Sequence, residues 1–193
     1  MRSIAFLFLA CLIGSCQSNK EVTPMNYKYG DQEQVINCEG QNNALLNEAL
    51  YSFEDDLLNT YDAESRRPIT AYGQFTFVGL SGQAEFKRIV SEHSKIVLSK
   101  LIEEGIIIKN TGAKSNVNYE HPAVVCAIDN LKDAALKKTI NALISTNSMD
   151  PVLFDSRLRN AGRLVQNQRY LAFYLSLDAY FQQLANLDMK PTE

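Results

Sequence analysis

The stretch QNNALLNEALYSFEDDLLNTY, residues 41–61, decides the fold class. Its apolar side chains recur at steps of four and three residues: Leu46, Leu50, Phe53, Leu57 and Tyr61. This period places them on one face of an α-helix, whereas a half-buried strand alternates with period two. The acidic run Glu54, Asp55 and Asp56 falls largely outside the apolar stripe, so we expect it to form a solvated surface. The stretch therefore predicts an amphipathic helix.

The same reading extends along the chain. Helical apolar stripes and end signals predict further helices at about residues 82–104, 122–145, 150–165 and 168–187. Residues 62–81 interrupt the pattern with a proline, several glycines and β-branched side chains, which predicts a long irregular loop, with room for a short strand. A series of helices without a strong series of strands predicts an all-α fold, a four- to five-helix bundle.

The first 16 residues, MRSIAFLFLACLIGSC, combine a basic start at Arg2 with an apolar core from Ile4 to Ile13. A helix that spans a membrane needs about 20 apolar residues, whereas a secretory signal needs about 7–15. The segment Ile13-Gly14-Ser15-Cys16 resembles the lipobox of bacterial lipoproteins. In that family the chain is cut before the cysteine, which carries diacylglycerol on sulfur and usually an acyl chain on nitrogen. The alternative is an ordinary signal peptide.

The resemblance implies a domain organisation and a cellular location. Residues 1–15 would be the signal peptide, residues 16–36 a polar tether lipidated at Cys16, and residues 37–190 a single helical domain. Acyl chains would anchor the protein to a membrane of the cell envelope. Gln17 rather than aspartate follows the cysteine, which favours the outer membrane in the best-known sorting system. The periplasmic and surface faces of that membrane both remain open.

Two cysteines remain in the exported domain, Cys38 and Cys126. An even pair in an oxidising compartment predicts a disulfide. In a bundle of alternating helices the first and third helices run parallel, so Cys38 before one and Cys126 in the first turns of the other would lie at the same end. The alternative is two separate buried thiols, and a reactive catalytic cysteine is a third reading.

Composition narrows the functional classes. The formal net charge is −3, and nucleic-acid binders carry a strongly basic face, so we expect no nucleic-acid partner. His93 lies on an apolar stripe and His121 in a loop, but neither Glu-x-x-His nor His-Glu-x-x-His occurs. We therefore expect no cofactor and no metal site, and a core role for His93.

The candidate binding surface comprises three aromatic residues of the predicted loop and two arginines of a later helix: Tyr72, Phe75, Phe77, Arg159 and Arg163. Loops on a rigid scaffold often carry function, and arginine suits anionic groups. The alternatives are aromatic rings that turn inward and arginines paired with nearby acids.

These features predict a membrane-anchored, non-enzymatic module that docks an envelope protein or polymer. One alternative is a small helical hydrolase or metal-dependent protein using His93 or His121, which should have an open cleft with converging carboxylates. The other is a carrier of a hydrophobic ligand, which should have an apolar cavity. A docking module should combine a closed core with a shaped surface patch.

Overall fold

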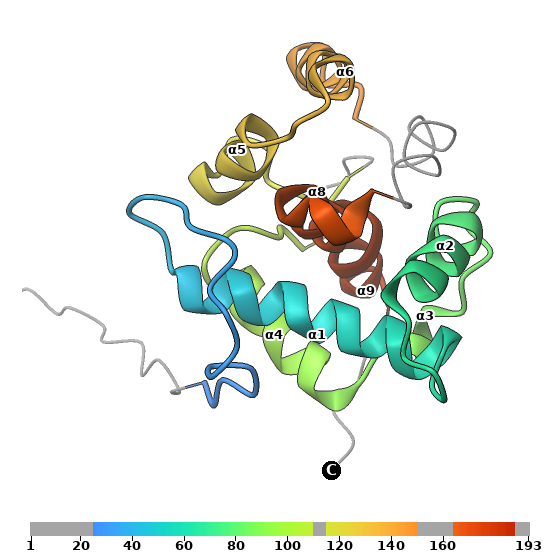
Figure 1. Cartoon of the computed structure of the whole chain (residues 1–193). Coiled ribbons are helices and arrows are strands. Elements are labelled where there is room, and N and C mark those ends of the chain that lie inside the picture. Colours follow the sequence, from blue (N-terminus) through green and yellow to red (C-terminus); the bar gives the residue numbers. More distant parts are fainter. Residues whose placement is uncertain (1–24, 110–114, 150–163, 188–193) are drawn as a thin grey trace, which may run out of the picture.

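The computed structural model describes residues 25–109, 115–149 and 164–187, and these residues form an all-helical fold (Figure 1). They contain no β-strand, and one isolated antiparallel bridge joins Ile107 to Val117. The all-α prediction is therefore confirmed. None of the described helices is long and apolar enough to cross a bilayer. The predicted signal peptide and Cys16 lie outside the described residues.

Helix α1, Asn43–Tyr61, crosses the middle of the molecule (Figure 1). The Asn42 side chain accepts a hydrogen bond from the Leu45 backbone N–H and so caps its start. Four of the five residues of the predicted stripe are buried and Tyr61 packs against them, as the helical period requires. Helices α2 and α4 pack against α1, which makes it the central element of the core.

The prediction of a long irregular loop at 62–81 is wrong in its second half, where residues Pro68–Val78 form helix α2. Pro68 suits the first turn because its missing N–H has no intrahelical partner there. Ala71 and Tyr72, and Phe75 about one turn later, are buried, and the two aromatic rings pack edge-on against Phe53 of α1. This burial outweighs the weak helix propensity of the segment.

Two predicted helices are each divided. The region 82–104 forms α3, Phe86–Ile89, and α4, Glu92–Glu103, with Ser91 capping the start of α4. The region 122–145 forms α5, Pro122–Asp129, and α6, Ala134–Ser145, with Asp133 accepting hydrogen bonds from two N–H groups of α6. Serine and aspartate hydrogen-bond orphan N–H groups, so each interior cap starts a new helix.

The last predicted helix is confirmed and almost entirely buried. After a 3-10 turn, η2, Val165–Asn167, the chain forms α8, Arg169–Leu175, then a π-helical segment η3, Ser176–Phe181, and α9, Gln182–Ala185. Its Tyr180 packs between Phe53 and Phe75, which closes the aromatic centre of the core. The helix predicted at about 150–165 lies almost wholly outside the described residues.

The segment before α1 is packed rather than extended away from the domain, and we call residues 25–37 the N-terminal strap. The side chain of Asn47 accepts hydrogen bonds from the backbone N–H groups of Val35 and Ile36 at 2.8 and 2.9 Å. Its amide group donates to the Ile36 carbonyl at 2.7 Å, and Ile36 is fully buried. The packed domain therefore begins before residue 37, the predicted boundary.

The predicted disulfide is confirmed. Cys38, directly after the N-terminal strap, is bonded to Cys126 of α5, and their Cα atoms lie 5.9 Å apart. Helix α5 packs mainly on α8, however, and not along α1. The bond therefore joins the start of the domain to its middle, as expected, without the parallel packing of two long helices that suggested it.

Candidate functional site

Of the acidic run predicted to be a solvated surface, Asp55 is partly solvated, whereas Asp56 and Glu54 are not at the open surface. Asp56 is buried, and its Oδ2 accepts hydrogen bonds from the Ser91 N–H at 3.1 Å, from the Ser94 hydroxyl at 2.6 Å and from the Tyr180 hydroxyl. Glu48 is buried as well, and Glu54 is largely covered. Each carboxylate meets partners from distant parts of the chain, which is information that a helical period does not contain.

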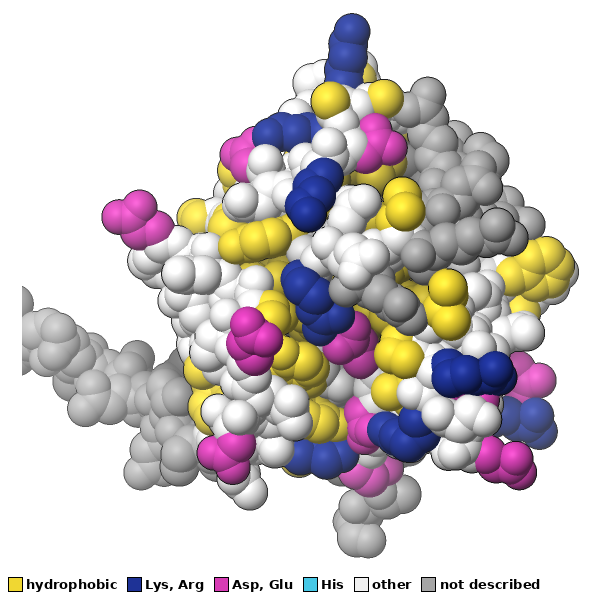
Figure 2. Space-filling model, in the orientation of Figure 1, with side chains coloured by type: hydrophobic (Ala, Val, Ile, Leu, Met, Phe, Trp, Pro, Cys, Tyr) yellow, Lys and Arg dark blue, Asp and Glu magenta, His cyan; other side chains and the backbone are white. Residues whose placement is uncertain are grey.

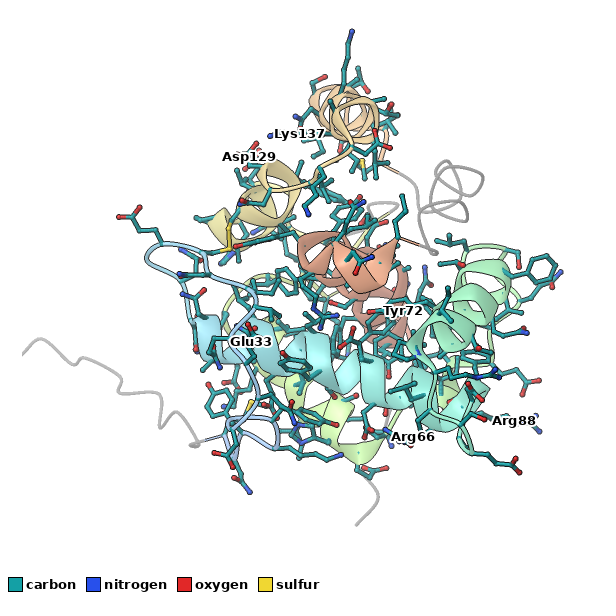
Figure 3. All side chains as sticks on the ribbon, in the orientation of Figure 1. Glu33, Arg66, Tyr72, Arg88, Asp129 and Lys137 are labelled. Atoms are coloured by element: carbon teal, nitrogen blue, oxygen red, sulfur yellow. A yellow bond between two sulfur atoms is a disulfide. The ribbon has the colours of Figure 1, made fainter. Side chains whose placement is uncertain are left out.

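A pocket opens where α1, α2 and α8 meet, and we call it the α1–α2–α8 pocket. Its volume is about 280 Å³. It is lined by Glu54, Leu57, Leu58, Pro68, Ala71, Tyr72 and Arg169. Figure 2 shows apolar, basic and acidic side chains next to one another over this region, and Figure 3 shows Tyr72 among these three helices. Aliphatic walls thus surround a small polar group.

The polar group is a paired set of charges. The two terminal nitrogens of Arg169 donate to the two carboxylate oxygens of Glu54 at 2.7 and 2.8 Å, and the Tyr72 hydroxyl donates to Oε1 at 2.8 Å. The Arg169 guanidinium also lies over the ring of Tyr51, 5.7 Å from its centroid. A bidentate pair of this kind fixes both side chains in one orientation.

The protonation of two of these groups is fixed near neutral pH. Burial, and then the adjacent Glu54 carboxylate, raises the pKa of Tyr72 well above its usual range. Burial lowers the pKa of Arg169, but the hydrogen bonds to Glu54 outweigh it and the net shift is upward. The hydroxyl and the guanidinium therefore offer fixed hydrogen bonds and charge, which suits binding better than proton transfer.

The residues of the predicted binding surface do not form one surface patch. Tyr72 and Phe75 are buried, as in the alternative of aromatic rings that turn inward: the ring of Tyr72 forms a pocket wall and that of Phe75 fills the core. Phe77 is 59% exposed on α2. Arg159 and Arg163 lie outside the described residues. The physical reason is that a helix at 68–78 turns two aromatic rings inward, one turn apart, and the third outward.

The two histidines lie at separate places. His93 Nε2 lies 2.6 Å from Oε1 of Glu48, and its ring meets Tyr29 edge-on at 5.8 Å. His121 caps α5, its Nδ1 accepting from the Ala123 N–H, and burial lowers its pKa. Within the described parts of the chain, no three His, Cys, Asp or Glu residues cluster as metal ligands would.

Sequence reasoning missed the pair of Glu54 and Arg169, which are 115 residues apart. One signal was present: Glu54 directly follows Phe53 of the apolar stripe, so it lies at the border of the buried face, where an acid needs a partner. Nothing in the sequence identifies Arg169 as that partner.

No protein-family model, no curated protein and no solved structure matches this chain.

Proposed function

We propose that this protein is a lipid-anchored module of the bacterial cell envelope, without enzymatic activity, that docks a partner polypeptide through the α1–α2–α8 pocket. The anchor rests on the resemblance of Ile13-Gly14-Ser15-Cys16 to a lipobox. The docking role rests on one observation above all, an open pocket with aliphatic walls and a fixed charge pair over a closed core.

The chemistry of the pocket favours a polypeptide over a sugar. Sugar rings stack on exposed aromatic faces, but the aromatic side chain in this pocket, Tyr72, is buried and presents little of its ring. The walls formed by Leu57, Leu58 and Ala71 suit one apolar side chain, and the carboxylate of Glu54 suits a neighbouring backbone N–H. In many protein interfaces, a few side chains inserted into pockets contribute most of the binding free energy.

The two alternatives receive less support from the described residues. The hydrolase reading needs a histidine in an open cleft, but His93 is mostly covered and is held by Glu48. The carrier reading needs a cavity inside the bundle, but rings of Phe53, Phe75 and Tyr180 fill the centre with centroids 5.2 to 6.4 Å apart. The pocket lies instead at the surface between helices, as a docking module requires.

The anchor is tested by mass spectrometry of the protein extracted from its own cells. We expect an N-terminal peptide that begins at Cys16 and carries the mass of diacylglycerol and an acyl chain. The matched Cys16→Ser variant should lack that mass and leave the membrane fraction. An unmodified mature N-terminus in the unsubstituted protein would overturn the anchor. Protease treatment of intact cells then places the domain outside or inside the outer membrane.

The docking role is tested by photo-crosslinking in intact cells. Benzoylphenylalanine replaces Ile69, which is exposed and adjoins Pro68 of the pocket, or Val125 on α5 as a matched exposed position. We expect a protease-sensitive adduct from position 69, none from position 125, and loss of the adduct when Leu58→Trp fills the pocket. An adduct that survives Leu58→Trp, or one digested by a muramidase and not by protease, contradicts the proposal.

A further inference from the structure

A second hollow lies along α4, and we call it the α4 groove. Its volume is about 340 Å³, and residues of α4 and of the end of the C-terminal helix line it. Prominent among them are Ile96, Ile102, Leu187, Lys95 and Lys109. Ile96 is 52% exposed, a large fraction for an isoleucine beside other apolar side chains. The groove thus has an apolar floor, and its rim carries two lysines and one acid, Glu92.

The position of the N-terminal strap relates this groove to the membrane. Tyr29 of the strap packs against His93 in the first turn of α4, next to Glu92 of the groove, so the strap passes near one end of the groove. In Figure 1 the start of the strap and α4 both lie below α1, and the rest of the strap crosses α1. Residues 17–24 alone separate Met25 from Cys16, and such a segment reaches about 30 Å at most when fully extended. An anchored domain cannot move far from the bilayer.

The charged side chains of the groove, Lys95, Lys109 and Glu92, leave it with an excess of one positive charge, which favours an anionic surface. Lys95 pairs with Glu92 at 2.5 Å, while Lys109 forms no ion pair with any residue that the structure describes. Lysines around an apolar surface suit the boundary between acyl chains and anionic headgroups, because each stem stays in the apolar layer while its ammonium group meets phosphate. An isoleucine between them would gain by leaving water.

We propose that the α4 groove rests on the membrane that holds the Cys16 lipid, with Ile96 among the acyl chains and Lys95 and Lys109 at anionic phospholipid headgroups. This inference rests on the proposed lipid anchor. It adds an orientation: α4 faces the bilayer, and helix α5, on the other side of α1 in Figure 1, faces away from it.

The absence of tryptophan from the sequence makes a direct test available. Ile96→Trp introduces one fluorescent indole into the groove, and Val125→Trp introduces one at a matched site on α5, where Val125 is 42% exposed. The full lipidated protein is reconstituted into vesicles of phosphatidylcholine with about one third phosphatidylglycerol, with or without brominated acyl chains. We expect bromine to quench the indole of Ile96→Trp at least about twofold and to leave Val125→Trp nearly unchanged.

Two further measurements complete the test. Adding Lys109→Glu to Ile96→Trp should reduce the quenching, because the groove loses its headgroup contact. Equal quenching of the two indoles, or an indole at position 96 that water-soluble acrylamide quenches equally with and without vesicles, would overturn the inference. Shielding from acrylamide without vesicles would point to a second copy of the chain and also overturn it. Failure of the protein to float with vesicles would instead remove the anchor itself.

Discussion

Glu48 and Glu54 lie less than two turns apart on α1, and each meets a basic side chain from far along the chain. Glu48 meets His93 and is 1% exposed, while Glu54 meets Arg169 and is 16% exposed. Glu48 also accepts hydrogen bonds from backbone N–H groups of the N-terminal strap, at Lys28 and Tyr29, whereas Glu54 accepts hydrogen bonds from the side chains of Tyr72 and Arg169. A carboxylate paired with a basic side chain is therefore sealed from solvent at Glu48 and borders an open pocket at Glu54.

The largest expected effect is a difference in the free energy of unfolding between variants of Glu48 and of Glu54. Glu48→Ala removes a buried carboxylate that accepts hydrogen bonds from two partly buried backbone N–H groups and pairs with His93, so the free energy of unfolding should fall by about 3–5 kcal/mol. Equilibrium urea unfolding, followed by circular dichroism, measures it. The matched Glu54→Ala should cost about 1–2 kcal/mol, since water reaches Arg169. Equal losses in the two variants would contradict the distinction between a sealed and an open site.

Two glycines of α2, Gly73 inside the helix and Gly79 at its C-terminal cap, give the next largest expected effect on stability. A Cβ added at Gly79 would lie 2.8 Å from the Phe75 carbonyl oxygen and 2.9 Å from its ring, so Gly79→Ala should destabilise the fold by about 1–3 kcal/mol. A Cβ at Gly73, inside α2, meets open space. Gly73→Ala should therefore stabilise by about 0.5–1 kcal/mol. Thermal unfolding of both variants tests this, and shifts of the same sign would contradict it.

Tyr72→Phe tests how much the hydrogen bond from Tyr72 to Glu54 contributes to stability and to docking. It removes the hydroxyl that donates to Glu54 at 2.8 Å and leaves the ring in place. The free energy of unfolding should fall by about 1 kcal/mol, the value of a typical hydrogen bond. Crosslinking from position 69 should weaken, because Glu54 loses one of the groups that orient it. Unchanged crosslinking with a full loss of stability would assign Tyr72 a structural role alone.

The smallest expected effect concerns pH and the outer edge of the strap. Burial would raise the pKa of Asp55, but hydrogen bonds from Lys28 and Arg66 outweigh it and lower the pKa to about 2. A pKa lower in the folded than in the unfolded state means that this carboxylate stabilises the fold above about pH 4, and that the contribution is lost as pH falls towards 2. These charges are partly solvated, so it should amount to less than about 1 kcal/mol.

Urea unfolding at pH 4.5 and pH 2.5 checks the effect of Asp55. We expect the unsubstituted protein to lose more stability between these two values than Asp55→Asn, which has no carboxyl group to protonate. Equal losses in both proteins would show that the pairs of Asp55 with Lys28 and Arg66 contribute nothing measurable.

The sequence predicted the secondary structure well where the burial of one helical face determines it. The stripe from Leu46 to Leu57 defined α1, because burial of a helical face needs no information from elsewhere in the chain. The prediction failed at Pro68–Val78, where turn-forming and β-branched residues suggested a loop although contacts with Phe53 of α1 stabilise a helix. Local propensity contains no record of such contacts.

The site was predictable only in fragments. Tyr72 was identified, but as a surface contact and not as a buried wall. The acids of α1 were taken as solvated, because period alone cannot show that Ser91, Ser94 and Tyr180 would surround Asp56. Pairs such as Glu54 with Arg169 form only after the whole chain folds, so sequence reasoning could mark an acid at the border of the core but could not name its partner.

The disulfide has a mechanical consequence. A pull on the chain before Met25 would peel the N-terminal strap from α1, breaking its hydrogen bonds to Glu48 and then to Asn47 one after another. Peeling stops at Cys38, because the covalent bond there passes tension to Cys126 in α5. The load is then shared between α1 and the helices around α8, and the 88-residue span between the two cysteines is not drawn out. The disulfide therefore limits how much of the domain a pull on the N-terminal segment can unfold.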